Sequence, residues 1–239
     1  MKTIMKFTDV SKSYKDGSDT IEALKPTNFE IKEGELVAII GPSGSGKSTL
    51  LTLMGGLQQP SKGQVSFLGQ DIGQMSQKER NRLRFDKIGF ILQASNLVPF
   101  LTVEEQFKLV DKYGRKHYDA DRAKKLMDEL GIYKRKDNYP GDLSGGERQR
   151  AAICRAIYAG PQLLLADEPT ASLDTEKAMT VAKILKELTH RTNRSTVMVT
   201  HDERLLSYCD RVFRITDGRL SEVTEEKLAD QAVPTVESE

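Results

Sequence analysis

The chain contains few of the residues that stabilise extracellular or zinc-binding proteins. Of its 239 residues only Cys154 and Cys209 are cysteines, and three are histidines. Neither cysteine lies at a spacing typical of a zinc site, so we expect two reduced thiols rather than a disulfide framework or a structural metal. No apolar run approaches the roughly 20 residues that span a bilayer, and the first six residues lack the apolar region of a signal peptide. We therefore expect a cytoplasmic protein.

An excess of one charge sign is also missing. Lys and Arg number 36 and Asp and Glu 35, which leaves a net charge of +1. Proteins that bind nucleic acid usually carry a clear basic excess. The composition therefore predicts no nucleic-acid partner.

The apolar residues gather in short continuous runs bounded by turn residues. Such runs are typical of strands that are buried on both faces of a parallel sheet, and helical patterns lie between them at Lys47–Leu57 and Met179–Leu188. This alternation predicts an α/β fold, with one domain over residues 1–223 and a short acidic tail over 224–239. The runs are Leu36–Ile40, Ile88–Leu92, Leu163–Ala166 and Thr196–Val199.

The N-terminal part of the chain departs from this alternation. Ile4–Val10 and Ile21–Ile31 have strand-like patterns on either side of a polar turn, and Gln64–Leu68 adds a third. These segments predict a small antiparallel β subdomain beside the main sheet. Near the other end of the chain, Phe213–Leu220 predicts a hairpin with an Asp-Gly turn.

Residues from about 94 to 150 are expected to form a mostly helical insertion. Thr102 and Glu105 make a capping box that would open one helix. A second helix is predicted over Asp119–Leu130, and Gly131 would end it as a C-cap glycine does.

A glycine-rich loop joins the first predicted buried strand to the helix that follows it. Its glycines would let backbone N–H groups turn toward an anion, and the helix adds the positive end of its dipole. Lys47 could then reach the β- and γ-phosphates of a nucleotide, and the Ser48 hydroxyl could bind Mg²⁺. A turn without function is the alternative, but the strand and helix on either side are the context that this motif needs. The expected nucleotide contacts are Gly41, Pro42, Ser43, Gly44, Ser45, Gly46, Lys47, Ser48 and Thr49.

Two acids, Asp167 and Glu168, end another buried strand. Side chains alternate along a strand, so the two carboxylates could take different roles. Asp167 would hold Mg²⁺, and Glu168 would polarise the water that attacks the terminal phosphate. An ordinary pair of acids before a turn at Pro169 is the alternative, and the presence of the phosphate loop argues against it.

A second candidate anion site lies at Leu143–Glu147. Ser144 and Glu147 form a capping box, and the helix start also contains Gly145 and Gly146. A glycine-rich helix start with a free hydroxyl can bind an anion. Two phosphate sites for one nucleotide predict a head-to-tail pair of chains, in which each pentapeptide contacts the γ-phosphate of the ATP held by its partner.

Together these motifs resemble the ATP-binding subunits of ABC transporters, over nearly the whole chain. Gly41–Thr49 resembles the Walker A loop, Leu143–Glu147 the family signature and Leu163–Glu168 the Walker B strand. The resemblance implies a P-loop ATPase core with Glu168, His201 and Lys47 as catalytic residues, and ATP and Mg²⁺ as cofactors.

Four single residues take roles only from this resemblance. His201 is similar to the switch histidine that contacts the γ-phosphate, and Gln93 to the Q-loop glutamine that contacts both nucleotide and metal. Asp174 ends a segment similar to the D-loop, and Tyr14 is similar to the aromatic residue that stacks on adenine. Taken alone, His201 would be read as an ordinary surface or core histidine and Tyr14 as a packing residue, and Gln93 would indicate nothing.

Within the family the chain is most similar to small exporters that release lipoproteins, macrolides or antimicrobial peptides. The segment Gly89–Phe100 also resembles the haem-efflux branch. The resemblance implies that ATP hydrolysis powers efflux or extraction of a hydrophobic or amphipathic substrate through a separate transmembrane permease. Two copies would dock on the inner face of the membrane, with residues 94–102 lining the groove for a permease helix.

Three other functions remain to be weighed. A soluble ABC ATPase acting on ribosomes or DNA would usually carry two cassettes or a long coiled coil, and this chain has neither. A scaffold without hydrolysis would not need Glu168 and His201. An import-type ATPase would usually carry a longer C-terminal regulatory region.

Overall fold

The main sheet of the computed structural model has six strands. The structure describes residues 1–17, 19–114 and 117–223, so the predicted tail lies outside the described residues. The strand order is β10-β9-β3-β8-β7-β6; β9 to β6 run parallel and β10 is antiparallel to β9. Three of the predicted buried runs are the central strands β3, β8 and β7, the fourth is the edge strand β6, and the predicted Asp-Gly hairpin joins β9 and β10. The bounds are β3 Leu36–Ile40, β6 Ile88–Ile91, β7 Leu163–Asp167, β8 Ser195–Val199, β9 Arg211–Thr216 and β10 Arg219–Val223.

A second, antiparallel sheet is formed by the N-terminal third of the chain, as predicted. Its order is β2-β1-β4-β5. Its two long strands extend further than expected, because the residues beyond the predicted ends are mostly polar and so give no apolar pattern. The bounds are β1 Thr3–Asp16, β2 Asp19–Lys32, β4 Lys62–Phe67 and β5 Gln70–Asp71.

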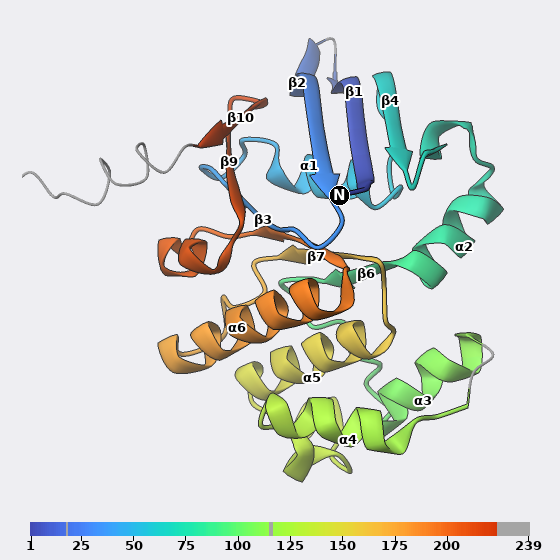
Figure 1. Ribbon diagram of the computed structural model, residues 1–239, viewed down its shortest axis with the longest axis vertical. Coiled ribbons are helices and arrows are strands. Elements are labelled where there is room, and N and C mark those ends of the chain that lie inside the picture. The colour runs from blue at the N-terminus through green and yellow to red at the C-terminus, as the bar shows by residue number, and fades with distance from the viewer. Residues whose placement is uncertain (18, 115–116, 224–239) are drawn as a thin grey trace, which may run out of the picture.

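Helices cover the main sheet on both sides. Helix α1 (Lys47–Met54) contributes four buried side chains to the core that the two sheets share. It ends at Met54 rather than at the predicted Leu57, because Gly55 and the turn after it close the helix. Helices α5 (Gly145–Tyr158) and α6 (Thr175–Thr192) lie on the side of the main sheet away from the antiparallel sheet (Figure 1).

The predicted helical insertion contains α3 (Val103–Gly114) and α4 (Ala120–Glu129). The expected capping box is present, since Thr102 N–H donates to Glu105 Oε2 at 2.8 Å and Glu105 N–H donates to Thr102 Oγ1 at 3.3 Å. None of the described helices combines the length and apolarity needed to cross a bilayer. Short 3₁₀ segments connect the elements: η1 Ile72–Gln74, η2 Tyr133–Arg135, η3 Pro140–Asp142 and η4 Glu203–Tyr208.

Helix α2 (Gln77–Lys87) was not predicted. None of its residues is buried, so the sequence has no apolar periodicity to reveal it. The capping box of Ser76 and Glu79, with both reciprocal hydrogen bonds formed, was the signal that could have found it.

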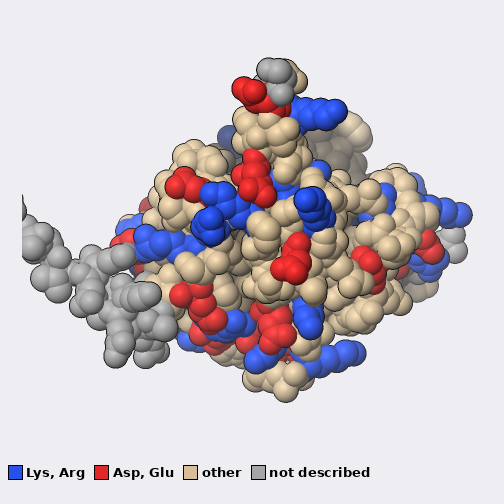
Figure 2. All heavy atoms as spheres, turned by 90° about the horizontal axis from the view of Figure 1, so that it is seen from above, with Lys and Arg blue, Asp and Glu red and all other residues tan. Residues whose placement is uncertain are grey.

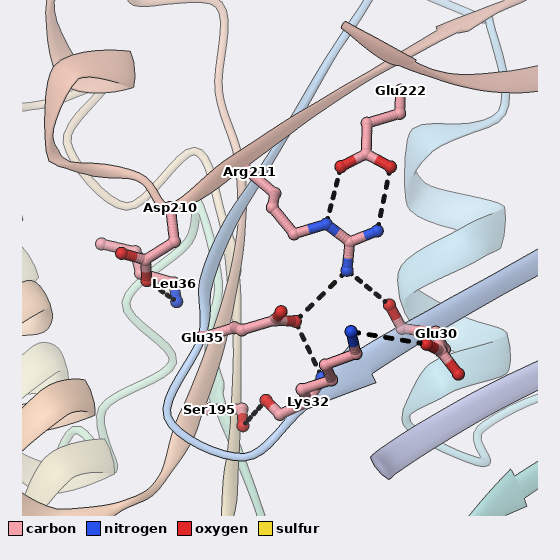
Figure 3. A network of polar contacts seen from close by, with 8 residues as sticks. All are labelled: Glu30, Lys32, Glu35, Leu36, Ser195, Asp210, Arg211 and Glu222. Atoms are coloured by element: carbon pink, nitrogen blue, oxygen red, sulfur yellow. Dashed lines mark hydrogen bonds and ion pairs between the residues drawn. The ribbon is translucent and has the colours of Figure 1, made fainter. Parts of the chain in front are cut away.

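Arg211 joins the two sheets through a network of polar contacts (Figure 3). Its guanidinium makes two hydrogen bonds to Glu222, at 2.7 and 3.0 Å. It also donates to the carbonyl of Glu30 at 3.1 Å and to Glu35 at 3.3 Å. Glu35 in turn accepts from the backbone N–H of Lys32. One side chain on β9 therefore holds β10 and the end of β2 together.

The upper face of the molecule carries both charge signs. Basic and acidic side chains are interspersed over this face, and neither forms a continuous field (Figure 2). This distribution agrees with the balanced composition of the chain.

Candidate nucleotide-binding and catalytic site

The predicted phosphate loop, acid pair, glutamine and histidine converge on one cavity. The cavity has a volume of about 510 Å³ and lies at the carboxyl ends of the parallel strands. Ligand sites of open α/β sheets form at this edge, where the loops leave the strands. The lining residues are Gly41, Ser43, Gly44, Gly46, Lys47, Ser48, Thr49, Gln93, Asp167, Glu168 and His201.

The shape of the phosphate loop depends on two glycines. Gly46 has φ 110°, and a Cβ there would lie 2.4 Å from the carbonyl oxygen of Ala23. A Cβ on Gly41 would lie 2.2 Å from the carbonyl oxygen of Ile215. The loop is thus pressed against the backbones of β2 and β9, and only glycine fits at either position.

The helix that follows begins without a side-chain cap. Gly46 is the N-cap of α1 and offers no side-chain acceptor to the first turn. The backbone N–H groups of that turn, together with the helix dipole, therefore favour an anion in the cavity. Lys47 begins this helix, and its ammonium donates to the carbonyls of Gly41 and Pro42 at 2.7 and 2.6 Å.

The two acids differ in environment. The pKa of Asp167 is raised, chiefly by burial and then by the charge of Glu168, while Lys47 acts in the opposite direction. Glu168 lies just beyond β7 with φ 47°, in the left-handed region that a non-glycine residue rarely adopts. The alternation of a strand therefore does not apply at Glu168, and both carboxyl groups line the same cavity.

Glu168 pairs with His201, a contact that the sequence did not predict. Glu168 Oε2 lies 2.9 Å from His201 Nδ1. The Glu168 side chain is 16% exposed and that of His201 is 75% exposed, so the histidine faces the open side of the cavity. The backbone N–H of Glu168 also donates to Val199 on β8, which fixes the acid beside that strand.

Gln93 reaches the cavity from a different element. It follows β6 by two residues, is exposed, and stands at the beginning of the predicted helical insertion. The cavity is thus lined by both the sheet core and the segment that leads into the insertion.

The other predicted site residues do not line this cavity. The Tyr14 hydroxyl donates to Gln58 Oε1 at 2.6 Å. Asp174 is the exposed N-cap of α6 and accepts from the backbone N–H of Lys177. Pro42 and Ser45 belong to the phosphate loop without lining the cavity, and the buried Ser45 hydroxyl has no hydrogen-bond partner among the described residues.

The signature pentapeptide begins α5, away from the cavity. Ser144 is its N-cap and forms both bonds of the predicted capping box with Glu147, yet Ser144 and Gly145 are exposed. Gly146, beside them, is partly exposed. The backbone hydrogen bond from Ser144, reinforced by Arg135, lowers the pKa of Glu147 to about 2.

Comparisons with known proteins agree with this geometry. The profile of the ABC transporter family matches residues 24–171. HrtA of Staphylococcus haemolyticus, named as a hemin import ATP-binding protein, is 45% identical over 213 residues, which cover 88% of this chain and 96% of that protein.

Two solved structures have the same fold. The ATP-binding cassette MJ0796, in a dimeric post-hydrolysis state bound to ADP and phosphate, has a TM-score of 0.86 at 36% identity and covers 92% of this chain and 99% of its own. CbiO1 of Clostridium perfringens, part of the ABC transporter complex CbiONQ, has a TM-score of 0.80 at 30% identity and covers 97% of this chain and 94% of its own. The chain belongs to the ABC transporter family, as a subunit that binds and hydrolyses ATP to power transport.

Proposed function

We propose that the cavity at Lys47 is the hydrolytic site, with a separate task for each group that lines it. The phosphate loop and Lys47 bind the phosphates. Glu168 polarises the attacking water, and His201, 2.9 Å from Glu168, contacts the γ-phosphate from the open side. The observation that carries this proposal is the convergence of four separately predicted segments on one cavity of about 510 Å³.

The same cavity suits Mg²⁺. Ser48, Gln93 and Asp167 line it with a hydroxyl, an amide and a carboxyl group, and such hard oxygen ligands are those that Mg²⁺ prefers. The Ser48 hydroxyl has no hydrogen-bond partner among the described residues, so it is available to a ligand. When bound, the metal would neutralise charge on the phosphates.

The complete site is shared by two copies arranged head to tail. Ser144 and Gly145 are exposed at the start of α5, where a partner's nucleotide could reach them. Asp174 is also exposed and outside the cavity. The dimeric MJ0796 cassette supports this arrangement by similarity.

A mixing experiment tests the shared site. A Ser144→Arg chain retains its own phosphate loop, and a Lys47→Ala chain retains its own signature. Mixed in equal amounts, they should recover a clear fraction of wild-type ATPase activity, because a heterodimer has one intact site. Each variant alone should be nearly inactive. If a mixture that is shown to contain heterodimers recovers no ATPase activity, the proposal is contradicted.

An exposed aromatic patch is the proposed contact for the permease. Phe100 is 75% exposed, Tyr113 70% and Phe85 47%, and the rings of Phe85 and Tyr113 meet edge to face at 6.4 Å. The exposed pair of Phe85 and Tyr113 supports a protein–protein contact, and Phe100 is an exposed aromatic side chain of the predicted groove. The patch widens the predicted groove at residues 94–102, because the unpredicted helix α2 contributes Phe85. Leu97 instead packs against the hydrophobic core that contains Phe107 of α3 and Ile157 of α5.

Binding to the permease tests the patch. We expect Phe100→Ser and Tyr113→Ser to reduce copurification of the membrane subunit while the unstimulated ATPase activity is kept. Tyr139→Ser, at a residue 49% exposed outside the patch, is the matched control and should keep the complex. Equal recovery of the permease with all three variants would exclude the patch.

The proposed cargo is hemin, moved outward through the permease with this chain on the inner face of the membrane. We infer the cargo from the name of the relative HrtA, which describes an ATP-binding protein of hemin import. The resemblance to small exporters supplies the direction. Cells lacking the transporter should become more sensitive to added hemin if it exports, and less sensitive if it imports. Unchanged sensitivity, with no stimulation of the reconstituted ATPase by hemin, would exclude hemin.

A further inference from the structure

Gln149 is a buried polar residue that the sequence motifs left without a role. It lies on α5 with 2% of its surface exposed. Its amide nitrogen donates to the carbonyl of Leu92 at 3.2 Å and to the carbonyl of Pro169 at 3.1 Å. These carbonyls belong to the residue before Gln93 and the residue after Glu168. One side chain therefore binds the backbone next to two groups that line the nucleotide cavity.

The chemistry of the side chain suits this position. A terminal amide carries two N–H donors on one nitrogen, and both acceptors here are carbonyl oxygens. Turning the amide over would place an oxygen against two oxygens, so the partners fix its orientation. An aliphatic side chain would leave both carbonyls without this donor, and burial makes such a loss costly.

The helix that holds Gln149 also carries the signature. Ser144 is the N-cap of α5, and Gln149 follows within the first two turns. A rigid helix thus connects the surface proposed to meet the partner's nucleotide with the loops of the chain's own cavity. The two hydrogen bonds, to the carbonyls of Leu92 and Pro169, would transmit a shift of α5 to the neighbouring Gln93 and Glu168 at the same time.

We propose that Gln149 is a positioning residue, which holds the Gln93 loop and the Glu168 turn in register with α5. It touches neither nucleotide nor water, and it acts through the placement of the two groups beside its carbonyl partners. This inference rests on the proposed roles of Gln93 and Glu168. Displacements of about 1 Å in a catalytic group can lower a rate by roughly a hundredfold, so loss of the two bonds should lower kcat by about tenfold or more.

The experiment compares Gln149→Met with Ile153→Val in the full-length chain. Methionine keeps the length of the side chain and removes both donors. Ile153 is fully buried on the same helix, so removing one methylene from it should cost stability in the core while both hydrogen bonds of Gln149 remain. Readouts are kcat, KM for ATP, and affinity for a non-hydrolysable ATP analogue.

We expect Gln149→Met to lose about tenfold or more in kcat and to bind the analogue within about twofold of wild type, because the phosphate loop is intact. Ile153→Val should keep kcat. A folded Gln149→Met chain with wild-type kcat would overturn the proposal, and so would parallel losses of kcat and affinity in both variants. Glu168→Gln and His201→Ala test the proposed site separately. If both kept full activity, the proposed hydrolytic site would be wrong, whatever the result for Gln149→Met.

Gln149→Glu provides a second test should the methionine variant not fold. A neutral carboxyl group can donate one hydrogen bond, whereas the ionised form would repel both carbonyls. Its activity relative to wild type should therefore rise as pH falls, because burial raises the pKa of the introduced carboxyl. A ratio that does not change with pH would overturn the proposal.

Discussion

Replacing Arg211 with Met should destabilise the fold without changing the nucleotide cavity. The guanidinium makes four polar contacts, to Glu222, Glu35 and the Glu30 carbonyl (Figure 3). Its side chain is 24% exposed, that of Glu35 11% and that of Glu222 47%. Methionine would retain the packing of the side-chain stem and remove every donor.

The magnitude follows from these exposures. The contact to the nearly buried Glu35 is a charged hydrogen bond, worth about 1.5–3 kcal/mol. The pair with Glu222 is open to solvent and adds about 0–1 kcal/mol. The bond to the Glu30 carbonyl adds about 1 kcal/mol. We therefore expect the free energy of unfolding to fall by about 3 kcal/mol.

Urea denaturation at pH 7 measures this change, with Arg82→Met as the control. Arg82 is 85% exposed in a pair with Asp86, and its replacement should change stability by less than about 0.5 kcal/mol. Arg211 holds the pKa of Glu222 below its usual value. The Glu222 contribution is therefore complete above the unfolded pKa of about 4.3 and is lost as pH falls through the lower folded pKa. A loss below about 1 kcal/mol at pH 7, or one that grows in acid, would refute this reasoning.

Three further predictions concern the cavity. Glu168→Gln should lower the rate of ATP hydrolysis by about 10²–10⁴-fold while ATP binding survives, because it removes only the general base. Phosphate release measures the rate, and size exclusion with ATP detects the ATP-bound dimer. A variant that hydrolyses ATP at the wild-type rate would exclude this role. Lys47→Ala should weaken ATP binding by about tenfold or more, because a charged hydrogen bond is lost; calorimetry that finds unchanged affinity would contradict the role of the loop. Asp167→Asn should raise the melting temperature of the nucleotide-free chain at pH 7 and impair hydrolysis. The folded pKa of Asp167 is raised by burial and by Glu168, so its ionised form opposes folding at neutral pH; a melting temperature at or below that of wild type would show the sign to be wrong.

The parts of the fold that sequence predicted are those whose burial leaves a clear pattern. Strands β3, β7 and β8 are short continuous apolar runs because helices or sheet cover both faces. Helices α3 and α4 were predicted from the capping signals at their ends. Helix α2 offers no buried face, so its sequence reads as a polar connection.

The residues of the site likewise divide into those that a local sequence pattern predicts and those whose contacts depend on the folded structure. The glycines of the phosphate loop were predictable because a local backbone shape requires them, and Lys47 because the motif places a lysine beside the phosphates. The pairing of Glu168 with His201 depends on a left-handed residue after β7 and on the neighbouring position of β8, and neither is encoded in a local pattern. Gln149 donates to carbonyls 57 and 20 residues away along the chain, so its partners appear only in the folded structure.

The residues that lie outside the cavity support the two-chain site on physical grounds. Ser144 and Asp174 both cap helices, and each already accepts a backbone N–H from its own chain. Capping uses one acceptor position and leaves these side chains exposed at the start of a helix dipole. A capping role alone would make Ala at Ser144 cost about 1 kcal/mol of stability and leave hydrolysis unchanged. If the site is shared, Ser144→Ala should slow hydrolysis by more than its stability loss explains, and Ser76→Ala, at the matching cap of α2, should not.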